Sequence, residues 1–220
     1  MWLGRALLLL LGVGLGGAAG SLWADTQVGA WAAALVGPEP KALWYASRST
    51  GWVSYALLWS ATCLGLMLSG RVARGGVAAS LAQLHRFAAG LALVFVTVHA
   101  LILLGDRYLK ADLLSTLLPF RFPYRPIWVG LGQLAAYAAA AVYGSVFLRR
   151  WTGYRFWRAL HYAAFGAYGL VTLHLLGAGT DVGPVAGAMV MASAAAVYGL
   201  LCLRVWEGSV RAAARGVRSA

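Results

Sequence analysis

The sequence predicts an all-α integral membrane protein that forms a single domain over residues 1–220. Of its 220 residues, 61% are hydrophobic and 11% are charged, and the mean hydropathy is +0.74. A soluble domain carries about 25% charged and about 45–50% apolar residues. Because backbone polar groups in lipid must be satisfied within the protein, apolar runs of roughly 20 residues indicate transmembrane helices. Six such runs predict a six-helix bundle: 6–23, 51–70, 83–104, 127–148, 158–177 and 183–203.

The first run, 6–23, has two interpretations. Arg5, the Leu-rich run and the small residues that follow it also resemble a secretory signal peptide. The run is longer than a usual signal core and lacks a clear A-x-A cleavage site, which favours a retained helix. The orientation expected for the later helices is the same in both cases.

The distribution of charge predicts the orientation. The segments 1–5, 71–86, 149–158 and 204–218 hold twelve basic residues and one acidic residue, whereas the segments on the other side hold six basic and five acidic residues. By the positive-inside rule the first set is cytoplasmic. We therefore expect a multi-pass protein of the cell (inner) membrane with both termini in the cytoplasm. The net charge of +12 reflects this topology and does not indicate nucleic-acid binding.

The four histidines of the chain all fall in two of the predicted helices. His85 and His99 lie in 83–104, and His161 and His174 lie in 158–177. In each helix one histidine is near the cytoplasmic end and the other toward the outer end. The separations of 14 and 13 residues correspond to roughly 21 and 20 Å along a helix axis.

An imidazole in a membrane is costly without a partner, and neutral imidazole is a standard axial ligand of haem iron. Histidines at two matched depths on two helices predict two non-covalent b-type haems between the third and fifth helices. Small residues between the histidines of each helix suit the close approach of a flat macrocycle, although they also serve helix packing. At about 100° per residue, 14 steps return to nearly the same face, but 13 steps miss it by about 140°. The fifth helix must therefore bend, change register or present its two ligands at different rotations, and Gly166 and Gly169 are candidates for a bend.

Four segments resemble the ferric reductase-like transmembrane domain of ferric reductases and NADPH oxidases, from about residue 42 to 203. They are WYASRSTGWVSYALLWSATCLGLMLSGR, LHRFAAGLALVFVTVHALILL, PYRPIWVGLGQLAAYAAA and WRALHYAAFGAYGLVTLHLLGAGTD. The 14-and-13 spacing of the histidines is also similar to that of this family. The stretch VGPEPKALWYASRSTG loosely resembles the outer loop of the haem-binding membrane subunit that feeds periplasmic methionine sulfoxide reductases.

The resemblance implies an inner haem on His85 and His161 and an outer haem on His99 and His174. It also implies that Arg48 lies near the outer haem, where it serves the haem propionates and the acceptor site. An interfacial anchor is an equal alternative for Arg48. Candidates for the inner propionates are Arg71, Arg86 and Arg158, although positive-inside charge explains these three almost as well.

The expected function is transmembrane electron transfer from a cytoplasmic donor to an outer-face acceptor, as in a membrane oxidoreductase haem subunit. The chain ends about 17 residues after the last predicted helix and has no dinucleotide-binding motif. We therefore expect a separate cytosolic flavoprotein reductase, or quinol, as the donor. The acceptor is a ferric chelate, oxygen or a periplasmic protein. The alternatives are a dedicated subunit of a periplasmic reductase, such as methionine sulfoxide reductase, and a cofactor-free transporter or membrane scaffold.

Overall fold

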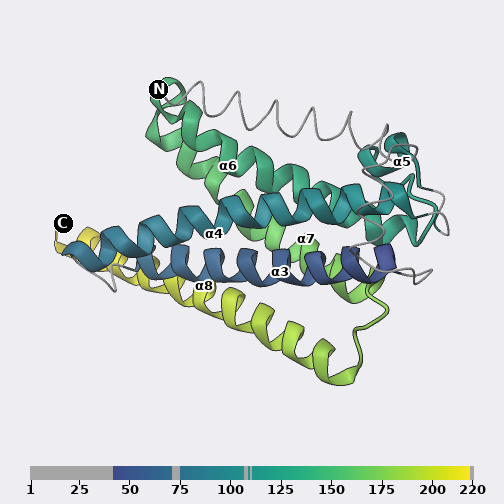
Figure 1. The fold of residues 1–220 in the computed structure, drawn as a ribbon. Helices are drawn as coiled ribbons and strands as arrows, with labels where there is room; N and C mark the ends of the chain where they lie inside the picture. The colour runs from purple at the N-terminus through teal and green to yellow at the C-terminus, as the bar shows by residue number, and fades with distance from the viewer. Residues whose placement is uncertain (1–41, 71–74, 107–108, 110, 219–220) are drawn as a thin grey trace.

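The computed structural model of the protein describes residues 42–70, 75–106, 109 and 111–218. The predicted first helix, 6–23, and the propionate candidate Arg71 lie outside the described residues. In the described part every regular element is helical (Figure 1). The elements are α3 (Ala42–Ser69), α4 (Gly75–Ile102), η1 (Leu103–Gly105), α5 (Leu113–Leu117), α6 (Pro126–His161), α7 (Ala163–Ala178) and α8 (Pro184–Arg218).

Four helical stretches of the described chain are long and apolar enough to cross a membrane. They are Ala42–Ser69, Gly75–Gly105, Pro126–Ala178 and Pro184–Val210. The third stretch has 53 residues and contains both α6 and α7, which pack along each other. The predicted all-α class is therefore confirmed, but six separate spans are not, because the runs 127–148 and 158–177 fall in one stretch. Each predicted run from 51–70 onward lies in, or within one residue of, one of the four stretches.

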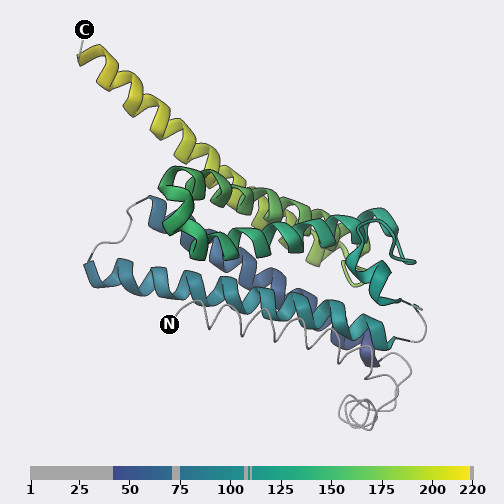
Figure 2. The same cartoon turned by 90° about the horizontal axis from the view of Figure 1, so that it is seen from above.

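Two helices are longer than the apolar runs from which they were predicted. Helix α3 begins at Ala42, so the segment just before residue 51, predicted to lie outside the helix, is helical. The hydroxyls of Ser49 and Thr50 there donate hydrogen bonds to carbonyls one turn earlier. Helix α8 continues to Arg218 through a segment rich in alanine and arginine, which are strong helix formers. Its C-terminal part projects beyond the other helices (Figure 2). Hydropathy locates the apolar part of a helix but not its ends.

The helices form two closely packed hairpins. Helix α3 lies along α4, and α6 lies along α7, whereas contacts between the two hairpins are sparse. Helix α8 touches α3 and α7 (Figures 1 and 2). The seam between the hairpins is where α4 faces α6 and α7.

Hydrogen bonds at regular intervals set the register of α3 against α4. Ser47 bonds His99, Ser54 donates to the carbonyl of Ala92 at 3.0 Å, and the carbonyl of Ala61 accepts from His85. Successive partners are seven residues apart on both helices, the repeat of an antiparallel left-handed helix pair. Small residues between them, such as the buried Ala88, allow the two backbones to approach closely.

A buried polar cluster joins α3 to α7 and α8. The hydroxyl of Tyr55 lies 3.0 Å from that of Tyr168 and 2.8 Å from that of Ser193, and Tyr168 and Ser193 are also 3.0 Å apart. Tyr168 is fully buried. Interhelical hydrogen bonds of this kind stabilise helix association where no hydrophobic force acts between helices. The cluster fixes how α7 sits relative to α3.

The chain reverses direction at a kink within α6. Gly153 has φ 81° and ψ 161°, a conformation that favours glycine and breaks the helix. Residues 149–157, predicted as an inner loop, are therefore helical on both sides of a kink at Gly153. The kink directs the chain back toward α7 (Figure 1).

Candidate functional site

The four histidines lie in two facing pairs across the seam between the hairpins. His85 of α4 faces His161, the last residue of α6, with ring centroids 6.1 Å apart. His99 of α4 faces His174 of α7, with ring centroids 6.2 Å apart. The structure thus brings together the histidines that were paired from the sequence.

The 13-residue spacing between His161 and His174 is accommodated by a helix break at Tyr162. Helix α6 ends at His161 and α7 begins at Ala163. The Tyr162 N–H is shared between the carbonyls of Arg158 and Ala159, and the Phe165 N–H bonds the Tyr162 carbonyl three residues earlier. Such tightened turns rotate the chain more per residue than an α-helix does. The bend was predicted at Gly166 or Gly169, which was wrong, because both glycines lie inside the regular helix α7.

Three of the four imidazoles are held through Nδ1 by a backbone carbonyl of a neighbouring helix. His85 bonds Ala61 at 2.8 Å, His99 bonds Ser47 at 2.6 Å and His174 bonds Trp128 at 2.9 Å. Since a carbonyl can only accept, Nδ1 carries the proton in all three rings. Nε2 is then the unprotonated nitrogen, which is the form that binds metals.

His161 is held differently. Its Nδ1 is buried without a hydrogen-bond partner among the described residues. Its ring instead stacks on Trp157, with centroids 5.1 Å apart and the planes at 29°. The guanidinium of Arg149 lies 4.8 Å from the centroid of the same Trp157 ring. Aromatic contacts and not a hydrogen bond orient this imidazole.

The separation within each pair suits two imidazoles that share one metal ion. If two imidazoles bind one metal ion from opposite sides through bonds of about 2.0–2.1 Å, their ring centroids lie roughly 6 Å apart. The described residues contain no group of three or more His, Cys, Asp or Glu side chains that could form a metal site alone. Each pair can therefore supply two ligands only.

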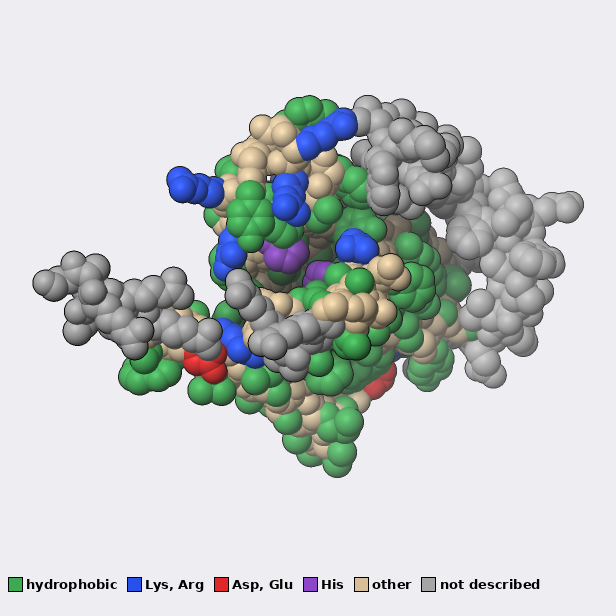
Figure 3. Space-filling view, turned by 90° about the vertical axis from the view of Figure 1, so that its left-hand side faces the viewer, with side chains coloured by type: hydrophobic (Ala, Val, Ile, Leu, Met, Phe, Trp, Pro, Cys, Tyr) green, Lys and Arg blue, Asp and Glu red, His purple; other side chains and the backbone are tan. Residues whose placement is uncertain are grey.

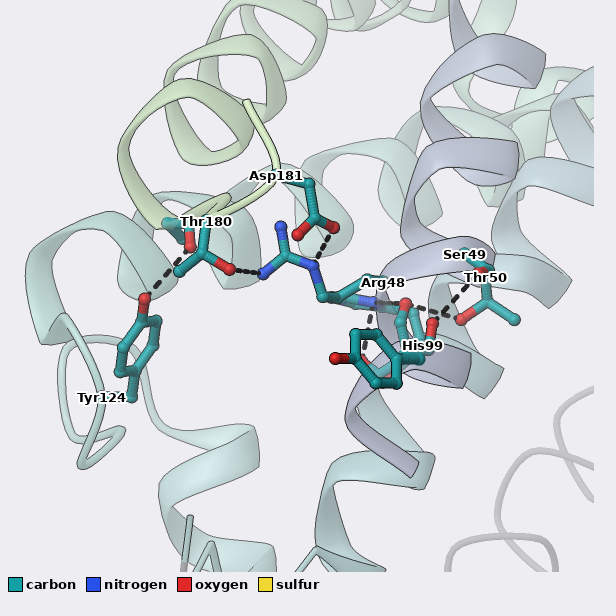
Figure 4. Close-up of polar contacts among 10 residues, drawn as sticks. Arg48, Ser49, Thr50, His99, Tyr124, Thr180 and Asp181 are labelled. Carbon is teal, nitrogen blue, oxygen red and sulfur yellow. Dashed lines mark hydrogen bonds and ion pairs between the residues drawn. The ribbon is translucent and has the colours of Figure 1, made fainter. Parts of the chain in front are cut away.

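Arg48 lies in α3 next to Ser47 and points to the loop between α7 and α8 (Figure 4). Its Nε forms an ion pair with Asp181, and its Nη1 donates to the Thr180 hydroxyl. The guanidinium also lies 5.4 Å from the Trp44 ring. Arg48 therefore connects the first hairpin to the outer end of α7, close to the residue that holds His99.

Arg86 and Arg158, the two described candidates for the inner site, are exposed at the opposite end of the bundle. Arg86 follows His85 on the surface of α4. Arg158 donates to the hydroxyls of Tyr154 and Tyr162 at 3.0 and 3.3 Å. Viewed from this end, basic side chains surround a depression in which histidine is visible (Figure 3).

The backbone groups that hold the histidines could not be predicted from the sequence. Every residue has a backbone carbonyl, so the residue type does not show which carbonyl accepts a hydrogen bond. The sequence also did not predict Asp181 as the partner of Arg48. One signal was available: Ser47 and Ala61 are 14 residues apart, the same separation as His85 and His99. In an antiparallel helix pair, equal separations place both contacts in one register.

Comparison of the chain with protein-family models, with curated proteins and with solved structures found no match.

Proposed function

We propose that this protein carries electrons across a membrane through two b haems, an inner one on His85 and His161 and an outer one on His99 and His174. The observation that supports this most strongly is the arrangement of all four histidines in two facing pairs. Each haem iron needs two axial ligands, and neutral imidazole is one of the commonest. Along α4 the two levels are 14 residues, or about 21 Å, apart.

Bound at these two levels, haem would supply a reversible one-electron carrier in each half of the membrane. The protein's own residues bind and orient it. The carbonyls of Ala61, Ser47 and Trp128 keep Nδ1 protonated and leave Nε2 available to the iron. The apolar helices around the pairs exclude water and lower the local dielectric, which favours the less charged state of a buried redox group.

The proposed direction of transfer follows from charge. The end with His85 and His161 carries the exposed Arg149, Arg150 and Arg155, and basic side chains gather on this face (Figure 3). The positive-inside rule would therefore make it cytoplasmic. A donor there, a flavoprotein reductase or quinol, would reduce the inner haem. The outer haem would then pass electrons to a ferric chelate, oxygen or a periplasmic protein. Both termini would be cytoplasmic in the cell (inner) membrane.

The proposal is tested by counting haem in the purified protein. A pyridine haemochrome assay should find two non-covalent b haems per chain in the wild type, and one in His85→Ala or His174→Ala. The matched control Leu173→Ala, an exposed neighbour on α7, should keep two. A colourless wild-type protein would show that the histidine pairs do not bind haem and would favour a transporter or scaffold.

A further inference from the structure

Each carbonyl that holds a histidine has a glycine four residues later in its helix. Gly51 follows Ser47, Gly65 follows Ala61 and Gly132 follows Trp128. In an α-helix the carbonyl of residue i already accepts from the N–H of residue i+4. The histidine Nδ1–H is therefore a second donor to the same oxygen, and it must reach that oxygen beside residue i+4.

A side chain at these three positions would block the approach, because the Cα–Cβ bond of a helical residue tilts toward the helix N-terminus. A Cβ on Gly132 would lie 2.6 Å from Nδ1 of His174, and one on Gly51 would lie 3.0 Å from Nδ1 of His99. A Cβ on Gly65 would lie 3.3 Å from Cε1 of His85. The first contact forces a shift, and the other two are tighter than ordinary van der Waals contact.

Three of the four histidines each approach a glycine, although glycines such as Gly130 and Gly169 are approached as closely by other side chains. Glycine accounts for 28 of the 220 residues, too few to expect it at all three positions by chance. Gly144 and Gly166, on the same two helices as Trp128 and His174, have nothing within 4 Å of a built Cβ. His161, the histidine without a carbonyl partner, contacts no such glycine among the described residues.

We propose that Gly51, Gly65 and Gly132 are positioning residues that admit His99, His85 and His174 to helix carbonyls and thereby set the redox potential of each haem. This inference rests on the proposed function. A hydrogen bond from Nδ1–H to a carbonyl raises the basicity of Nε2. A more basic axial ligand stabilises ferric over ferrous iron, so loss of the bond raises the potential of that haem alone.

The test is a spectroelectrochemical titration of the purified holoprotein with single Gly→Ala variants. Gly51→Ala and Gly132→Ala should raise the potential of one and the same haem, and Gly65→Ala should raise that of the other. The shift should be largest for Gly132→Ala and smallest for Gly65→Ala, in the order of the Cβ contacts. The controls Gly144→Ala and Gly199→Ala, where a Cβ would meet nothing within 4 Å, should leave both potentials unchanged.

Thermal unfolding supplies a second readout. Alanine normally stabilises a helix relative to glycine, so Tm should rise in the two controls and fall in the three positioning variants. If Gly132→Ala does not accumulate as folded protein, the test is made with Gly65→Ala, which has the longest Cβ contact of the three. Two haems with potentials unshifted in all variants would overturn this inference and leave the proposed function intact. A wild type without haem would overturn both.

Discussion

The outer and inner histidine pairs are equally spaced but are held by different forces. At the outer end, both imidazoles bond a carbonyl, one from α3 and one from α6. At the inner end only His85 does so, while His161 ends a helix and stacks on Trp157. A hydrogen bond fixes both the direction and the tautomer of a ring, whereas stacking restrains only its plane. The outer site is therefore the more rigidly preorganised, and the inner site depends on the side chains around the helix break.

The ends also differ in their cations. At the outer end Arg48 is tied to Asp181 and Thr180. At the inner end Arg149 and Arg150 lie over the aromatic rings of Trp157 and Trp151, at 4.8 and 4.1 Å, without an acidic partner in these contacts. A cation stacked on a ring remains available to a partner's negative charge. The arginines of the inner end thus contact aromatic rings, whereas Arg48 joins α3 to the loop between α7 and α8.

The largest expected effect separates the two haems by position. His174→Ala should remove the outer haem and leave an inner haem that still reduces from the cytoplasmic side. Electrons should then stall, because roughly 20 Å of helix bundle separates the inner level from the outer face. Stopped-flow reduction in vesicles with an impermeant outer acceptor measures both steps.

In that assay Leu173→Ala, with both haems, should deliver electrons at the wild-type rate. Unimpaired delivery by His174→Ala would contradict the pairing or the orientation of the histidines.

A smaller effect should distinguish the stacked histidine from the hydrogen-bonded ones. Trp157→Leu removes the ring on which His161 stacks. An aromatic pair contributes about 0.5–1.5 kcal/mol, so affinity for the inner haem should fall by roughly two- to tenfold while the outer haem is retained. Haem titration monitored by absorbance, with the exposed Phe156→Leu as control, measures this. Equal loss of both haems in Trp157→Leu would mean that the ring stabilises the bundle as a whole.

The ion pair of Arg48 should contribute modestly to stability. Asp181 is about half exposed, and exposed ion pairs contribute about 0.2–1 kcal/mol. Asp181→Asn should lower the free energy of unfolding by that amount at low salt and by less at high salt. Glu207→Gln, at the exposed i,i+3 pair with Arg204, is the matched control. A salt-independent loss in Asp181→Asn would indicate that the hydrogen-bond geometry matters more than the charge.

The smallest expected effect lies in the outer loop, at helix α5. The backbone N–H of Ser115 donates to the Asp112 carboxylate at 2.8 Å, and the polar groups of Ser115 lower the pKa of that carboxylate below the ordinary value of 3.8. Because the pKa is lower in the folded state, the cap stabilises α5 above about pH 3.8 and this stabilisation is lost as the pH falls through the folded-state pKa.

Hydrogen exchange of the Ser115 and Thr116 amides should therefore be slower at pH 6 than at pH 3, after correction for the intrinsic rate. Asp112→Ala should remove this difference. Equal protection in the variant and the wild type at pH 6 would show that the cap does not stabilise α5.

The sequence by itself determined the fold class, the depth of each histidine and their division between two levels. The preference of an apolar residue for lipid depends on that residue and its neighbours in the chain, and the rise per helical residue is constant. The apolar runs and the level of each histidine could therefore be predicted, although the helical residues just before residue 51 could not.

Only the tertiary structure decided how the histidines face one another and what holds them. The break at Tyr162, the carbonyls of Ala61 and Trp128, and the partner of Arg48 are relations between helices that are far apart in the sequence. Their free energies depend on the register and rotation of two helices at once, and these are set by close packing such as the Tyr55–Tyr168 contact. No property of a single segment contains that information.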